Sequence, residues 1–133
     1  MNRTPLKLAG TLARWLLGLV FLLFGLNGFL HFIPMPPPTG VAGQFLGALF
    51  ISHYLAVVFL LQLIPAALLL LNRFVPLALT LLGPLIVNIL LFHGLMAPDG
   101  LLLALLVTAL WLLVFWSVRS AFAGLFQPRV PTQ

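Results

Sequence analysis

The chain has 133 residues, of which 63% are hydrophobic and only 5% are charged, whereas an ordinary soluble domain is about 25% charged. This composition excludes a water-soluble globular domain, and it excludes a disordered chain because disordered segments are poor in apolar residues. The sequence contains no cysteine, so disulfides, iron–sulfur ligands and thiol nucleophiles are not part of its chemistry. The six Lys and Arg residues are scattered along the chain, and no nucleic-acid binding is therefore expected.

Four apolar runs are long enough to cross a lipid bilayer as helices: residues 12–33, 54–71, 75–95 and 101–122. The hydrocarbon core of a bilayer takes about 20 helical residues. Backbone polar groups inside it need internal hydrogen bonds, and these runs lack the apolar–polar alternation of membrane β-barrels. We therefore predict an all-α integral membrane protein, with a single four-transmembrane-helix bundle over residues 12–122.

The segments between these runs contain residues that end or begin helices. The proline cluster at residues 34–38 ends the first helix, because proline lacks the backbone N–H and clashes with the preceding turn. Residues 41–50 are uncharged but too short to span, and they predict a short interfacial or re-entrant helix. Turns follow at residues 72–73 and 97–100, and Asp99 is expected to cap the fourth helix.

Positive charge is confined to one side of the predicted bundle. The six Lys and Arg residues lie near the two termini and in the Asn72-Arg73 turn, whereas the two opposite loops contain none and hold the only acid, Asp99. The positive-inside rule then predicts that both termini are cytoplasmic. Residues 1–11 and 123–133 are accordingly predicted to be cytoplasmic segments, and the lipid bilayer is the first partner of the chain.

The few polar side chains within the spans are the candidate site, because such side chains are costly in hydrocarbon and tend to face the bundle interior. With a helix rise of about 1.5 Å per residue, five of them fall near the midplane or in the outer half: Asn27, His31, Gln62, Asn88 and His93. Asn27 and His31 are four residues apart and are expected to share one helix face. We predict that these side chains line an apolar pocket that opens outward.

Such a pocket suits the head group of a quinone, because His and Asn hydrogen-bond carbonyl oxygens and His can pass the protons of quinone reduction. Structural roles remain open for the same residues. Asn27 and Asn88 can hydrogen-bond each other between helices, and the histidines, including His53, can be ordinary interfacial residues. No metal site is predicted, because the three histidines show no short ligand spacing, and a bis-histidine haem is no better supported.

Three stretches carry a resemblance to a known family: GLVFLLFGLNGFLHFIPMPPPTGVAGQF, LLLLNRFVPLALTLLGPLIVNILLFH and APDG. Together they resemble the DoxX-like family of small four-helix membrane proteins, over residues 16–106. The resemblance implies a multi-pass protein of the bacterial inner (cytoplasmic) membrane, in a family named after a subunit of a thiosulfate:quinone oxidoreductase and linked to membrane redox complexes. It also implies that Asn27, His31, Asn88 and His93 occupy recurring polar positions of the family.

One departure from the family pattern concerns the second span. Members often carry a glutamate there, followed by a Gly-Gly step, whereas this chain has Gln62 and then Pro65-Ala66. The buried carboxylate that would act as a proton carrier is therefore missing. No catalytic residue and no self-sufficient active site is identified, and the chain is at most one subunit of a quinone-linked oxidoreductase.

Two functions from different classes follow from these observations. The first is an accessory or quinone-linked component of a membrane redox complex, with a quinone as the ligand of the outward-facing polar pocket. The second is a non-catalytic scaffold or assembly subunit of a larger membrane complex, which fits the small size and the lack of acids and cysteines. The expected protein partners are such a complex or further copies of the chain. A transport function ranks last, because the cytoplasmic half offers no polar path.

Overall fold

The computed structural model of the protein describes residues 4–133, so Arg3 and the first residues of the predicted cytoplasmic segment 1–11 lie outside the described residues. The described part of the chain contains helices and no strands. In chain order the elements are α1 (Thr4–Leu30), α2 (Gly40–Ile51), α3 (Tyr54–Leu71), α4 (Val75–Leu95), the 3₁₀ turn η1 (Pro98–Gly100), α5 (Leu101–Val118) and the 3₁₀ helix η2 (Arg119–Phe126).

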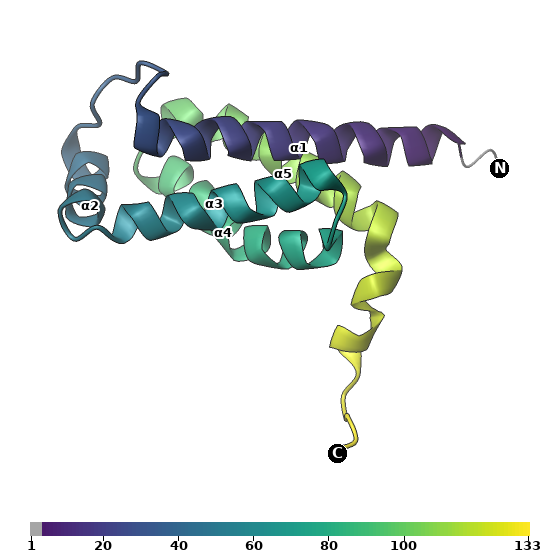
Figure 1. Ribbon diagram of the computed structural model, residues 1–133. Coiled ribbons are helices and arrows are strands. Elements are labelled where there is room, and N and C mark those ends of the chain that lie inside the picture. The colour runs from purple at the N-terminus through teal and green to yellow at the C-terminus, as the bar shows by residue number, and fades with distance from the viewer. Residues whose placement is uncertain (1–3) are drawn as a thin grey trace.

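Four long apolar segments, built on α1, α3, α4 and α5, are sufficient in length and composition to cross a membrane. This confirms the predicted all-helical fold with four long apolar helices. α1 and α4 each pack against both α3 and α5, so α1 and α4 lie diagonally across the bundle (Figure 1). The largest side chains at the centre are fully buried and come from all four helices: Leu17, Leu69, Leu79, Leu82 and Val114.

The short helix predicted at residues 41–50 is present as α2, over Gly40–Ile51. It packs against α3 and lies crosswise to α1 and α3 at one end of the bundle (Figure 1). We call this end, where α1 and α4 finish and α3 and α5 begin, the α2 end. The other end, which carries both chain termini and the turn between α3 and α4, is called the terminal end.

α1 is displaced along the sequence relative to the predicted span 12–33. It begins at Thr4, where Pro5 is accommodated because the first helical turn needs no N–H donor, and it ends at Leu30. His31 then adopts a left-handed conformation with φ 52°. The expectation that Asn27 and His31 share one helix face is therefore wrong, because the helix has ended before His31.

The turn between α3 and α4 is closed by left-handed residues and by a cation from α1. Asn72 has φ 53° and Phe74 has φ 51°, and the N–H groups of Asn72 and Arg73 donate to carbonyls in the last turn of α3. The Arg14 guanidinium also donates to Leu69 O there. A cation at a helix C-terminus satisfies carbonyls that have no intrahelical partner, so Arg14 ties α1 to the end of α3.

The fourth span begins at Leu101 as predicted, but its N-cap and its C-terminal end differ from the prediction. Asp99 does not cap α5, because Pro98–Gly100 forms a 3₁₀ turn that runs directly into the helix and places Gly100 at the N-cap, without a side-chain cap bond. At the other end α5 stops at Val118 instead of residue 122, and η2 turns away from the bundle (Figure 1). Phe122 is buried and packs on Phe115, with ring centroids 5.0 Å apart, which holds the start of η2 against the bundle.

Candidate functional site

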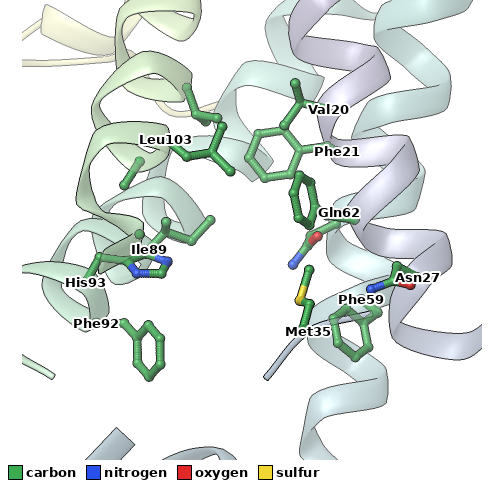
Figure 2. Close-up of a pocket in the computed structure, with 14 residues that line it drawn as sticks. Val20, Phe21, Asn27, Met35, Phe59, Gln62, Ile89, Phe92, His93 and Leu103 are labelled. Atoms are coloured by element: carbon green, nitrogen blue, oxygen red, sulfur yellow. The ribbon is translucent and has the colours of Figure 1, made fainter. Parts of the chain in front are cut away.

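A cavity of about 430 Å³ lies among α1, α3, α4 and α5 near the α2 end. Its volume is in the range of about 300–1,000 Å³ typical of small-molecule sites. Most of its wall is apolar, and the polar side chains that line it are Asn27, Gln62 and His93. In Figure 2, Gln62 and Asn27 lie on one side of the space and His93 on the other. The structure therefore brings together these members of the predicted site.

Gln62 is the most exceptional side chain of the cavity. It lies in the middle of α3 and is only 9% exposed. Its carboxamide makes no hydrogen bond to residues 4–133, yet the carboxamide N and O atoms are not completely buried. They are reached from the cavity that Gln62 lines, and Figure 2 shows the carboxamide directed into this space. A buried polar group without a partner costs free energy comparable to a lost hydrogen bond, so Gln62 presents a donor and an acceptor that a ligand would satisfy.

His93 approaches the cavity from the last turn of α4. Its Nδ1 lies 3.0 Å from Ala97 O, and because a carbonyl oxygen can only accept, Nδ1–H is the donor. Nε2 of the neutral ring is then a hydrogen-bond acceptor. The ring lies against Gly100, where an added Cβ would overlap its atoms. The Ala97 carbonyl and the absence of a side chain at Gly100 together determine the orientation of His93.

Asn27 has a structural bond in addition to its place in the cavity wall. Its Oδ1 accepts a hydrogen bond from Ile33 N–H at 2.6 Å, and its backbone carbonyl accepts one from His31 N–H at 2.9 Å. These bonds hold the segment that follows α1, which includes the cavity residue Met35. Within residues 4–133 its Nδ2 donates no hydrogen bond, so Asn27 both shapes the wall and offers a donor to a ligand.

Asn88 lies outside the cavity, contrary to its predicted place in the pocket. α4 turns Ile89, Phe92 and His93 toward the cavity, whereas Asn88 is exposed on another side of this helix. Its Nδ2 donates to Pro84 O of its own helix at 2.9 Å. The alternative in which Asn27 and Asn88 hydrogen-bond each other does not hold either, because within residues 4–133 Asn27 Oδ1 bonds to Ile33 N–H, Asn88 bonds to its own helix, and no bond joins the two side chains.

His31 is also separated from the cavity. It is exposed and lines an open groove of about 790 Å³ between α2 and the adjoining ends of α1 and α3, together with His53. Asn27, Met35 and Phe59 line both the groove and the cavity, so these side chains form the wall between them. Among residues 4–133 no group of three or more His, Cys, Asp or Glu side chains is close enough to hold a metal ion.

Several residues of the site carried no recognisable signal in the sequence. Met35, Phe59 and Phe92 line the cavity, but a chain with 63% hydrophobic residues offers no means of distinguishing them from other apolar positions. Gly100 had an indirect signal, because a glycine that follows a turn and lies near a histidine in sequence can mark a close approach. Only the position of the His93 ring identifies that approach.

Comparison of the chain with protein-family models, with curated proteins and with solved structures gives no match.

Proposed function

We propose that the protein is a multi-pass protein of the bacterial inner membrane, with both termini in the cytoplasm and the α2 end on the outer side. Four long apolar helices support insertion into a membrane. The described cations Lys7, Arg14, Arg73, Arg119 and Arg129 lie toward the terminal end or in the C-terminal tail, and Asp99 lies at the α2 end. This distribution follows the positive-inside rule.

We further propose that the cavity binds the head group of a quinone or quinol, and that the protein is an accessory component of a membrane redox complex, as its resemblance to the DoxX-like family implies. The observation that carries this proposal is the buried carboxamide of Gln62, which has no hydrogen-bond partner among residues 4–133 and faces His93 across an apolar space. A quinone carbonyl would accept from the Gln62 N–H. A quinol hydroxyl would donate to Nε2 of His93.

The apolar remainder of the wall supports the same class of ligand. Phe21, Phe24, Ile89, Leu103 and Val107 surround the polar side chains, and an aromatic head group would bury its faces against them. The chain contains no cysteine and therefore no redox-active thiol. In this proposal the electrons come from a partner subunit. The protein holds the ligand and supplies hydrogen bonds.

The first test is a titration of the purified protein, in lipid nanodiscs, with a short-chain benzoquinone and with its quinol. Replacing Gln62 by Leu should weaken binding about fivefold or more, because one hydrogen bond contributes about 1 kcal/mol. His93→Ala should weaken quinol binding similarly, whereas His31→Ala should have no effect, since His31 lies on the groove. Isothermal titration calorimetry measures each dissociation constant.

Thr108→Val is the matched control for Gln62→Leu. Thr108 lies in α5 near the middle of the bundle, and its hydroxyl donates to Ala104 O of its own helix. Removing this polar group should leave quinone affinity unchanged. Equal affinities of wild-type protein, Gln62→Leu and His93→Ala would contradict the quinone site, and recovery of a ligand-free chain bound to a larger complex would support the scaffold alternative.

A further inference from the structure

The exposed face of α4 carries polar groups that the bundle does not satisfy. This face is formed by residues spaced three and four apart, which share one side of a helix, and its members are Leu77, Thr80, Pro84, Val87, Asn88, Leu91 and Leu95. We call it the α4 outer face. It is separate from the cavity, because the cavity residues of α4 are Ile89, Phe92 and His93.

Asn88 is a carboxamide within the part of this face that would lie in hydrocarbon. It is three residues beyond the midpoint of the 21-residue helix, which places it about 5 Å from the centre along the axis at 1.5 Å per residue. Its Nδ2 donates to Pro84 O, and within residues 4–133 its Oδ1 accepts no hydrogen bond. Polar side chains at such depth are rare on lipid-exposed faces, because hydrocarbon offers no partner.

Pro84 adds a second polar group to the same face. Proline has no N–H, so the carbonyl of Thr80, four residues earlier, lacks its usual intrahelical donor. The Thr80 hydroxyl does not replace this donor, because it is bonded to Pro76 O at 2.8 Å. Thr80, Pro84 and Asn88 are each exposed and four residues apart, so the face has a polar stripe through an otherwise apolar surface.

We propose that a second copy of this chain covers the α4 outer face, in a two-fold dimer in which the Asn88 side chains of the two copies hydrogen-bond each other. A carboxamide has both donor and acceptor, so it is complementary to another carboxamide. Two copies inserted in the same orientation place Asn88 at the same depth, and a two-fold axis along the membrane normal brings identical residues together. A lipid tail offers no hydrogen-bonding group. An unrelated protein would need a polar side chain at the same membrane depth as Asn88.

Leu91 provides the position for a direct test, because the chain contains no cysteine and a single introduced thiol reports only on its own contacts. Leu91 is 53% exposed and lies one turn beyond Asn88 on the same face. Leu91→Cys is purified, reconstituted alone into liposomes at low protein density and treated with copper phenanthroline. The expected product is a disulfide-linked dimer. Leu23→Cys is the control, because Leu23 is 46% exposed on α1, diagonally across the bundle.

Asn88→Leu in the Leu91→Cys chain tests the role of the carboxamide. Loss of one interhelical hydrogen bond should weaken dimerisation about fivefold, and Asn88→Gln, which keeps the carboxamide, should retain more cross-linking than Asn88→Leu. Circular dichroism confirms that each variant retains its helices, and Leu is a residue well suited to a lipid-exposed position.

Equal cross-linking of Leu91→Cys and Leu23→Cys would overturn the proposed interface. Cross-linking that is unchanged by Asn88→Leu would overturn the pairing of the carboxamides. A disulfide that forms only in native membranes, and joins Leu91→Cys to a protein of different mass, would overturn the second copy as the occupant. None of these results depends on quinone binding, because the α4 outer face and the cavity are formed by different residues.

Discussion

At position 100 the chain has room only for a hydrogen atom, because the imidazole of His93 occupies the place of a Cβ. The backbone of Gly100 has φ −93°, a value that any residue adopts. Glycine is therefore needed here for space and not for conformational freedom. At the scale of single residues, the position of the Nε2 acceptor in the cavity depends on the missing side chain of Gly100, whose N–H donates to Ala97 O, the same carbonyl that His93 Nδ1 bonds.

Gly100→Ala should displace the His93 ring and weaken quinol binding about as much as His93→Ala, by about fivefold if one hydrogen bond of about 1 kcal/mol is lost. Titration calorimetry with the quinol checks this expectation. Gly94→Ala is the control, since a Cβ at Gly94 has no atom within 4 Å, and its affinity should equal that of the wild type. Wild-type affinity of Gly100→Ala would show that the ring position is not important for binding.

At the scale of elements, the end of α1 determines the wall between the cavity and the groove. The side chain of Asn27 accepts from Ile33 N–H and thereby turns the segment before the proline cluster, which brings Met35 into this wall beside Phe59. α1 also packs closely on α3 at Gly28. This contact requires glycine, because a Cβ at Gly28 would overlap the Phe59 ring. Small residues at such contacts let helix backbones approach.

Asn27→Ala should lower the free energy of unfolding by about 1–3 kcal/mol, because Ile33 N–H then loses its partner in a half-buried position. Thermal unfolding in detergent, followed by circular dichroism, measures the change. Thr108→Ala is the comparison, since its hydroxyl bonds only to its own helix, and it should destabilise the protein less. Equal effects of the two substitutions would mean that the bond to Ile33 does not hold the segment.

At the scale of the whole molecule, charge and polarity are segregated between the two ends of the bundle. The cations among residues 4–133 occupy the terminal end and the C-terminal tail, and Arg14 stabilises the last turn of α3 there. The cavity, the groove and all three histidines lie toward the α2 end. In the proposed orientation, a ligand would therefore reach the cavity from the outer side of the membrane.

This orientation is tested with single cysteines in the otherwise cysteine-free chain. Thr39→Cys, at an exposed position before α2, should react with a membrane-impermeant maleimide in intact spheroplasts. Thr132→Cys, in the C-terminal tail, should react only after the membrane is opened. Mass spectrometry of the labelled protein provides the measurement, and the reverse pattern would place the α2 end in the cytoplasm.

Local turn residues in the sequence correctly predicted the bounds of the helices that they flank. The predicted spans 54–71 and 75–95 coincide with α3 and α4, because turn residues at Ser52-His53, Asn72-Arg73 and Met96–Gly100 interrupt the helices. Arg14 of α1 adds a bond to Leu69 O at the second of these turns. The ends of α1 and α5 were misplaced. Asn27 ends α1 through a contact with Ile33 that depends on the path of the chain, and Phe122 is held by packing on Phe115.

The sequence by itself determined the helical class and the number of long apolar helices, because hydropathy and turn chemistry act over short stretches of chain. Only the tertiary structure decided which polar residues meet. Asn88 and His93 lie on the same helix, yet one is exposed and the other lines the cavity. The long helices are apolar on nearly all sides, so sequence periodicity does not reveal which side faces inward. Rotation about each helix axis is set by packing between helices, which in this bundle directs Gln62 and His93 into one cavity.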